Sequence, residues 1–336
     1  MASAGEASST TGSESTVTAA ARKLWTRTVG VVGNGFIGSA AQELACDAVR
    51  VIAFDLDPKL CVPAGMTMEL LCKEADVVWV SVPTPMNADG SACLSIVEKA
   101  VASCRKAGAT CILLRSTVPP GTSRRLGVAF MPEFLTEANA RKDFRESNRW
   151  YVGFDAATAV ARLSASTSDE PGSMEAAVIT KEALEMAHEH GRIGDRGFRC
   201  RVLHQTAAAE MIKYAGNVTL ASKAGLSNEL ERVSAALDVP WELVRECMGE
   251  DARIGPSHTM VPGPDGHRGF GGTCFPKDVQ ALRAVGRELG VPTPVLDAVW
   301  ERNVKIDRPE RDWETDKGRA VVGVDPKEAE ATETGS

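Results

Sequence analysis

Apolar runs alternate with segments of helical spacing along the first half of the chain. Four runs have the length and the β-branched content expected of buried strands, and they begin at Arg27, Val49, Ala75 and Ala109. The segment of residues 39–48, between the first two runs, is compatible with a helix. Strands that alternate with helices predict an α/β fold whose sheet is parallel and doubly wound, with helices on both faces.

Helical spacing dominates the second half of the chain. Residues 206–237 place apolar side chains as one long helix does, and residues 279–290 predict a shorter helix that ends at Gly290. Lys213 and Asn217 are four residues apart and therefore share one face of the long helix. A lysine on such a helix is usually solvated, but its pairing with an asparagine indicates a polar spot on a packed helix. We therefore expect a helical domain built on this central helix.

The length and composition set the expected domain organisation. A chain of 336 residues with 43% hydrophobic residues can bury two domain cores. Both ends are polar or charged, which is typical of disordered or extended segments. One short apolar run, residues 318–324, interrupts the last segment and is too short to form a domain. The predicted division is a disordered tail, a sheet domain, a helical domain and a charged, mostly extended tail, over residues 1–26, 27–205, 206–306 and 307–336.

Charge and cysteine content narrow the class of protein. A net charge of -7 and a pI near 5.4 provide no broad basic surface for nucleic acid or for an anionic membrane. No run approaches the roughly 18 apolar residues that span a bilayer, and the start of the chain lacks the apolar core of a secretory signal. Nine cysteines without CxxC spacing or nearby histidines indicate neither a disulfide framework nor a metal site. We expect a cytoplasmic protein without a bound metal.

Three glycines follow the first predicted strand in the pattern GxGxxG. Gly33 would permit the tight turn, Gly35 would let the backbone approach a pyrophosphate, and Gly38 would allow the helix to pack on the strand. Phe36 and Ile37 lie inside the same turn. The pattern alone is weak evidence, but a strand precedes it and a segment compatible with a helix follows it, as a dinucleotide site of the Rossmann type requires.

Asp55 follows the second predicted strand, twenty residues after Gly35. A carboxylate at this distance can accept hydrogen bonds from the adenosine ribose and would repel a 2′-phosphate, so that NAD is favoured over NADP. Asp57 is an alternative for this role, although a turn residue before Pro58 is the simpler explanation.

The next two predicted strands end in polar turns, VPTP and STVPPGT. Ligands gather at the carboxyl ends of the strands in an open parallel sheet, so both turns should line the cofactor cleft. Ordinary turn chemistry would explain either turn taken alone. The residues expected at the cleft are Val82, Pro83, Thr84, Ser116 and Thr117, of which the two threonines offer hydroxyl groups near the nicotinamide or its ribose.

The segment FGGTCFPKD places one thiol directly before a predicted helix start. Pro276 suits the first turn of a helix, so Cys274 would lie near the positive end of the helix dipole, where a thiolate is favoured. Lys277 and Asp278 add a cation and a carboxylate next to it. A free cysteine is more often a small buried apolar residue. The glycine-rich turn and the helix start favour a nucleophile here.

Two carboxylates, Glu133 and Glu137, lie in the segment PEFLTEANA after a short apolar run. Either could be a solvated surface charge. A carboxylate beside a nucleotide site would repel phosphate and is better suited to water or to sugar hydroxyl groups.

Taken in order along residues 28–305, these motifs resemble the UDP-glucose/GDP-mannose dehydrogenase family, and most closely its UDP-glucose 6-dehydrogenases. The resemblance rests on GNGFIG, VPTP, STVPPGT, PEFLTEANA, AAEMIKYAGN, RIG and FGGTCFPKD. It implies that two NAD molecules oxidise an alcohol carbon through an aldehyde to a carboxylate. Cys274 would form a thiohemiacetal and then a thioester, which is hydrolysed.

The resemblance also implies a role for each matched residue. Lys213 and Asn217 would stabilise the oxyanion, while Asp278 and Glu133 are both candidates for handling the proton and the water. Arg253 matches an arginine that reaches the site of a neighbouring subunit, which implies a homodimer joined through the central helix. The other implied contacts are Glu137 and Lys277 for the cofactor, and Phe134, Leu135, Arg253, Phe270 and Gly271 for the nucleotide-sugar substrate.

The sequence departs from the family in two places. Family members usually carry a third domain that closes over the nucleotide, and we expect it to be absent here. The segment between Asp55 and Val77 is also shorter than usual. UDP-glucose is the first choice of substrate, and UDP-glucuronate the expected product. Two alternatives stay open: a two-electron hydroxy-acid dehydrogenase, and a non-catalytic protein that binds NAD.

Overall fold

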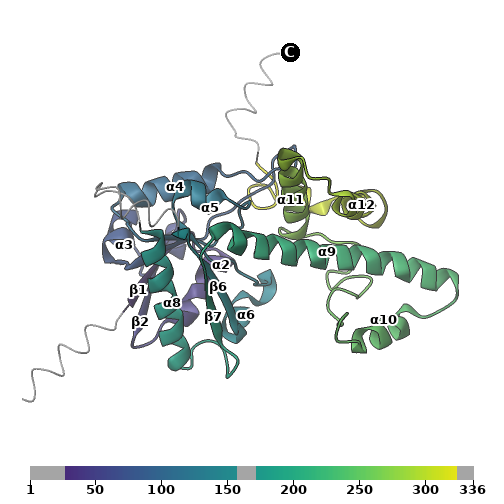
Figure 1. The fold of residues 1–336 in the computed structure, drawn as a ribbon, viewed down its shortest axis with the longest axis horizontal. Coiled ribbons are helices and arrows are strands. Elements are labelled where there is room, and N and C mark those ends of the chain that lie inside the picture. Colours follow the sequence, from purple (N-terminus) through teal and green to yellow (C-terminus); the bar gives the residue numbers. More distant parts are fainter. Residues whose placement is uncertain (1–26, 157–171, 324–336) are drawn as a thin grey trace, which may run out of the picture.

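A seven-stranded sheet forms the centre of the first half of the protein (Figure 1). The computed structural model describes residues 27–156 and 172–323, so the tail expected over residues 1–26 lies outside the described residues. The strand order is β2-β1-β3-β4-β5-β6-β7, and every neighbouring pair is parallel except β5 and β6. The strands are β1 (Arg27–Val32), β2 (Val49–Phe54), β3 (Val77–Val80), β4 (Ile112–Leu114), β5 (Ala129–Phe130), β6 (Arg149–Gly153) and β7 (Arg199–Leu203).

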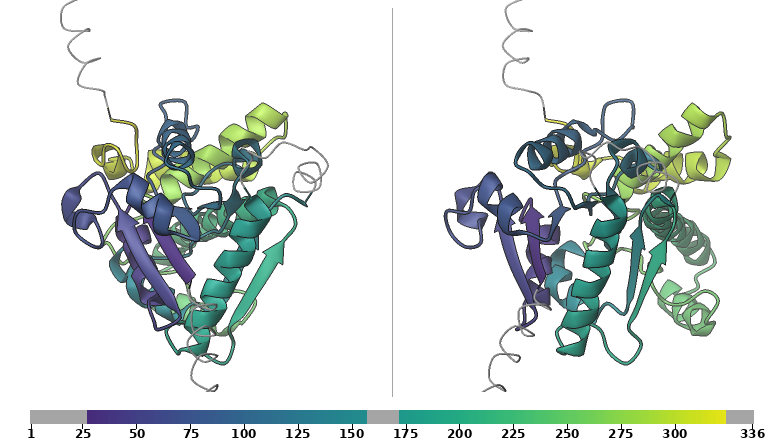
Figure 2. Two further views of the ribbon diagram at one scale, coloured as in Figure 1. Left: turned by 90° about the vertical axis from the view of Figure 1, so that its left-hand side faces the viewer. Right: turned by 60° about the vertical axis from the view of Figure 1, so that its left-hand side comes forward.

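Helices cover both faces of this sheet. One face packs against α2 (Phe36–Ala40), α6 (Ala140–Glu146) and α8 (Ser173–Glu189), and Figure 2 shows α8 lying along the strands. The other face packs against α3 (Met68–Glu74), α4 (Ser95–Lys106) and the first turns of α9. Strands covered on both faces must be apolar throughout, which explains why all four residues of β3 are buried. The predicted fold class is confirmed.

The helix predicted over residues 39–48 is shorter than expected. Helix α2 ends at Ala40, and a 3-10 turn over Ala41–Leu44 follows it. The chain then turns back at Cys46, whose backbone exchanges two hydrogen bonds with Val49 as β2 begins. The prediction was wrong for residues 45–48 because this reversal replaces the last helical turn.

The helical half is built on α9 (Thr206–Ala236), as predicted. This helix runs from the sheet along α11 (Phe275–Leu289) and α12 (Pro294–Arg302) towards α10 (Trp241–Glu250) (Figure 1). An apolar cluster joins α9 to α11, and it contains Val218, Ala221, Phe270 and Val279. Among the described residues, no helix is both long and apolar enough to span a membrane.

Residues 307–323 fold back onto the protein. We expected a loose, extended segment here, and that prediction was wrong. The side chain of Trp313 is 3% exposed and packs against Trp300, and a 3-10 turn over Asp312–Thr315 carries it. The Met86 N–H donates to the Ala320 carbonyl oxygen (2.9 Å), and the Val322 N–H donates to the Met86 carbonyl oxygen (3.0 Å). The short apolar run therefore makes isolated bridges instead of a strand.

Candidate active site

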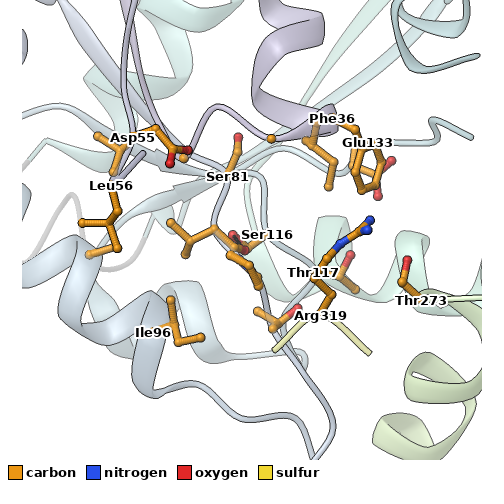
Figure 3. Close-up of a pocket in the computed structure, with 18 of the residues that line it drawn as sticks. Phe36, Asp55, Leu56, Ser81, Ile96, Ser116, Thr117, Glu133, Thr273 and Arg319 are labelled. Atoms are coloured by element: carbon orange, nitrogen blue, oxygen red, sulfur yellow. Dashed lines mark hydrogen bonds between the residues drawn. The ribbon is translucent and has the colours of Figure 1, made fainter. Parts of the chain in front are cut away.

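A cavity of about 870 Å³ opens at the carboxyl ends of β1, β3 and β4 (Figure 3). Asp55 and Leu56 lie at one end of it, and Phe36, Glu133, Thr273 and Arg319 lie towards the other. Cys274 also lines this cavity. Twelve of the predicted cofactor residues line the cavity: Gly33, Gly35, Phe36, Ile37, Asp55, Val82, Pro83, Thr84, Ser116, Thr117, Glu137 and Lys277.

The glycine turn has the geometry that a dinucleotide requires. Gly33 has a positive φ of 87°, and a Cβ there would lie 2.8 Å from the Ser81 carbonyl oxygen. A Cβ on Gly38 would lie 2.0 Å from the Gly33 carbonyl oxygen, so this glycine lets α2 pack close to the turn. Gly35 has no atom within 4 Å of its Cβ position, which leaves its backbone open to a ligand. The three positions therefore match the tight turn, the packing contact and the ligand approach that the motif predicts.

Asp55 is fixed just beyond β2. Its Oδ2 accepts a hydrogen bond from the Asn34 N–H (2.6 Å), and its Oδ1 accepts one from the Asp57 N–H (2.9 Å). Each oxygen keeps a lone pair for a ribose hydroxyl group. Asp57 instead accepts from the Lys59 N–H (3.0 Å), which confirms it as a turn residue.

Two pairs of polar side chains lie near Cys274. Lys213 and Glu133 form a buried ion pair, with 2.8 Å between Nζ and Oε1. Asn217 Nδ2 donates to Asp278 Oδ2 (2.5 Å), and Asp278 also pairs with Lys277. Lys213 and Asn217 are 4% and 7% exposed, so the polar spot predicted on the central helix is buried. The structure thus brings all five predicted catalytic residues together.

Opposing effects set the charge of the ion pair. Burial favours the neutral carboxyl group of Glu133, but Lys213, the Leu135 N–H and the more distant Arg115 together hold its pKa below the ordinary value. Burial likewise disfavours the charged amine of Lys213, while Glu133, Asp278 and Cys274 raise its pKa above the ordinary value. Both groups are therefore ionised at neutral pH.

Cys274 lies at the start of α11, with Pro276 in the first turn, as predicted. The expected thiolate is not favoured, however. Burial raises the pKa of the Cys274 thiol. The carboxylates of Asp278 and Glu133 raise it further, and the amines of Lys277 and Lys213 lower it by less than this combined increase. The helix start and Asp278 were visible in the sequence, but Glu133 and the burial come from tertiary packing.

This protonation state predicts a slow reaction of Cys274 with iodoacetamide at neutral pH. The thiolate is the reacting species, so the rate should rise with pH and reach half its maximum above the ordinary thiol pKa of 9.0. Mass spectrometry of the tryptic peptide of residues 269–277 would follow this thiol alone, because the peptide holds no other cysteine. Cys247 is exposed and serves as the reference. A half-maximum below pH 8 would contradict the expectation.

The predicted substrate residues lie outside the cavity lining. Phe134 and Leu135 flank Glu133, and the Phe134 ring centroid lies 5.7 Å from Lys213 Nζ. Phe270 is buried in the apolar cluster between α9 and α11, and Gly271 packs against the side chain of Arg308. Arg253 lies on the surface, where its guanidinium binds Asp251. Their contacts with a substrate stay predictions.

Two arginines near the cavity were missed in the sequence. Arg319 enters the cavity from the segment expected to be loose, and it pairs with Glu137 while its guanidinium carbon lies 5.7 Å from the Phe36 ring centroid. The only signal for it was the apolar content around Trp313 and residues 318–324. Arg115 is 1% exposed and lies between the rings of Trp79 and Phe144, with burial lowering its pKa to about 10.

Comparisons with known proteins identify the family of this chain. The NAD binding domain model of the UDP-glucose/GDP-mannose dehydrogenase family matches residues 63–166, and its central domain model matches residues 207–305. Together they match more than half of the chain. The first match indicates NAD as the cofactor.

Individual relatives agree with the family models. The UDP-glucose 6-dehydrogenase of Pseudomonas aeruginosa is 34% identical over 69% of this chain and 49% of its own length. That of Rickettsia bellii is 29% identical over 69% of this chain and 50% of its own length. This chain therefore spans about half the length of these curated relatives.

The fold also agrees with solved structures. A UDP-glucose dehydrogenase from Pyrobaculum islandicum superposes with a TM-score of 0.65 at 26% identity, over 83% of this chain and 68% of that one. A 3-hydroxyisobutyrate dehydrogenase from Mycobacterium tuberculosis superposes with a TM-score of 0.56 at 16% identity, over 82% and 92%, and shares the fold alone. Because the two domain models together cover more than half of it, this chain belongs to the UDP-glucose/GDP-mannose dehydrogenase family.

Proposed function

We propose that this protein is an NAD-dependent dehydrogenase that oxidises a nucleotide sugar to its uronic acid. The preferred reaction converts UDP-glucose, two NAD and water to UDP-glucuronate, two NADH and protons. The single observation that supports it is that the Cys274 thiol and the glycine turn share one cavity, with the Lys213–Glu133 pair beside the thiol.

Residues at the two ends of the cavity would bind different parts of the cofactor. Gly35 would take the pyrophosphate and Asp55 the adenosine ribose, while Thr84 and Thr117 would hold the nicotinamide half. NAD, when bound, accepts the hydride from the sugar carbon. Leu56 and Ile96 give the end of the cavity near Asp55 an apolar wall that suits an adenine ring.

The residues around Cys274 would carry the covalent steps. Because the thiol is protonated, its attack on an aldehyde carbon must be coupled to loss of the proton, and Asp278 and Glu133 are the carboxylates near it. The Lys213 amine and the Asn217 amide would stabilise the alkoxide of the thiohemiacetal. After the second oxidation, one of the same carboxylates would activate the water that cleaves the thioester.

We further propose that two copies of the chain pair through α9. The outer half of this helix exposes apolar side chains, with Leu226 and Val233 being 57% and 54% exposed. An apolar surface of this kind is typical of a subunit interface. The dimer would let Arg253 approach the site of the other subunit. The division into domains at residues 205 and 206 and the cytoplasmic location stay predictions.

The stoichiometry of NADH per sugar tests the proposed function. The purified protein should form two NADH for each UDP-glucose consumed, and NADP should be a poor replacement because Asp55 repels its 2′-phosphate. GDP-mannose and N-acetylated sugar nucleotides serve as alternative substrates in parallel assays.

Two other outcomes would contradict this proposal. One NADH per substrate would identify a two-electron dehydrogenase. NAD binding in calorimetry, without turnover or binding of any sugar nucleotide, would identify a non-catalytic protein.

A further inference from the structure

The turn that follows α12 contacts the glycine-rich loop ahead of Cys274. The Asn303 side chain makes two hydrogen bonds to the backbone of a single residue in this loop. Its Oδ1 accepts from the Phe270 N–H (2.8 Å), and its Nδ2 donates to the Phe270 carbonyl oxygen (2.9 Å). Asn303 is 1% exposed, so water cannot replace either bond without a large rearrangement. The Asn303 amide therefore fixes the position of the loop backbone at Phe270.

The glycines on either side of Phe270 allow this close approach. Gly269 has a positive φ of 68°, and a Cβ there would lie 2.2 Å from Asn303 Oδ1. A Cβ on Gly271 would lie 2.4 Å from the guanidinium carbon of Arg308. The loop is thus in contact with two side chains of one turn, over three consecutive residues.

Arg308 is itself held firmly. Its Nε and Nη2 donate to the two carboxylate oxygens of Asp312, and its Nη1 donates to Asp265 Oδ2, each at 2.6 Å. The Arg308 N–H also donates to the Asn303 carbonyl oxygen (2.7 Å). A planar guanidinium with paired carboxylates on its edge presents a fixed flat face, and Gly271 packs against that face.

The thiol of Cys274, in contrast, has little direct support. Within the described residues its Sγ has one hydrogen-bonding neighbour, Thr273 Oγ1, at 3.8 Å. Gly272, between the loop contacts and this pair, has a positive φ of 70° and open space around its Cβ position. The position of the sulfur therefore depends on the backbone on both sides of Cys274. On the helix side, the Asp278 N–H donates to the Cys274 carbonyl oxygen (3.0 Å), and on the loop side the backbone is held at residues 269–271.

We propose that Asn303 and Arg308 are positioning residues that hold the loop of residues 269–271 and thereby aim Cys274 at the reacting carbon. Neither side chain lines the cavity, so neither would contact a cofactor held there. This inference rests on the proposed function for its catalytic half. A displacement of about 1 Å in a reacting group can reduce the rate about a hundredfold. The loss should appear in kcat, while the affinity for NAD stays unchanged.

Asn303→Ala tests the inference with two independent measurements. The first is the rate at which iodoacetamide modifies Cys274, read from the tryptic peptide of residues 269–277. Release of the loop should expose the half-buried thiol and speed its alkylation at least threefold. The second is turnover of UDP-glucose, where kcat should fall at least tenfold. A faster reagent reaction together with slower catalysis is the signature of a misplaced nucleophile.

Three controls accompany this variant. Lys305→Ala changes the same turn on its exposed side, where Lys305 pairs with Glu301, and both rates should keep their wild-type values. The buried Cys104 and Cys111 report global loosening, because their alkylation would then rise as well. Asn303→Asp retains an acceptor for the Phe270 N–H but places an oxygen against the Phe270 carbonyl group, so its effects should be intermediate.

The outcomes separate this inference from the proposed function. Faster alkylation of Cys274 alone, in either Asn303 variant, supports the positioning role even if wild-type protein turns over none of the sugars tested. Unchanged alkylation and unchanged kcat in both variants would overturn it. Equal acceleration at Cys104, Cys111 and Cys274 in both variants would also overturn it, because Asn303 would then support the whole fold.

Discussion

Cys274→Ser should abolish uronic acid formation, with a loss of at least about a thousandfold in turnover. A serine hydroxyl at this position keeps the size of the side chain but is a far weaker nucleophile than a thiol. Its neighbours would still stabilise an oxyanion, since Lys213 and Asn217 are unchanged. The assay measures NADH and uronate together, and the NAD affinity by calorimetry should remain at the wild-type value.

Cys247→Ser is the matched control for this substitution. Cys247 is exposed on α10, away from the cavity lining, so its loss should leave turnover unchanged. Undiminished uronate formation by Cys274→Ser would rule out the thioester mechanism.

Lys213→Met should cost about 3–5 kcal/mol of unfolding free energy as well as the activity. The methionine fills a similar volume, but it leaves the buried carboxylate of Glu133 without its nearest cation. Urea denaturation monitored by tryptophan fluorescence would measure the loss. Lys181→Met provides the comparison: Lys181 and Glu185 form an ion pair on the partly exposed surface of α8, and breaking it should cost less than about 1 kcal/mol.

The double variant Lys213→Met with Glu133→Gln separates the two causes of instability. Removing both charges takes away the unpaired carboxylate, so most of the lost free energy should return while the activity stays absent. If the double variant were as unstable as Lys213→Met alone, the cost would lie in packing and not in the buried charge.

The effect of Lys213→Met on stability should depend on pH. The pKa of Glu133 is lowered in the folded protein, so its stabilising contribution is present above the ordinary carboxyl pKa of 4.5 and is lost as the pH falls through the folded value. The difference in unfolding free energy between wild type and Lys213→Met should therefore shrink below that range.

The residues that could be predicted from the sequence are those whose role depends on short-range geometry. Gly33, Gly35 and Gly38 lie within one turn, and Asp55 follows a strand that pairs directly with the strand before that turn. Lys213 and Asn217 share a helical face wherever the helix packs. These features do not depend on how the helices and strands pack together.

The remaining features depend on contacts between distant parts of the chain. The pKa of Cys274 responds to Glu133, which the fold brings from 141 positions earlier in the sequence. Asn303 meets Phe270 across 33 positions; Phe270 begins the motif FGGTCFPKD, but no motif marks Asn303 as its partner. The fold-back of residues 307–323 depends on Trp313, a single apolar side chain among charged neighbours. Spacing rules cannot assign such partners.

The fold-back has a thermodynamic consequence for the protein as a whole. The cavity is lined both by the turn at Gly33 and by Arg319, which lie near the opposite limits of the described chain. A ligand that contacts both would connect, without a covalent bond, two segments that are far apart in the sequence. Its binding energy would then oppose fraying at either extremity, because neither could detach without first surrendering the ligand.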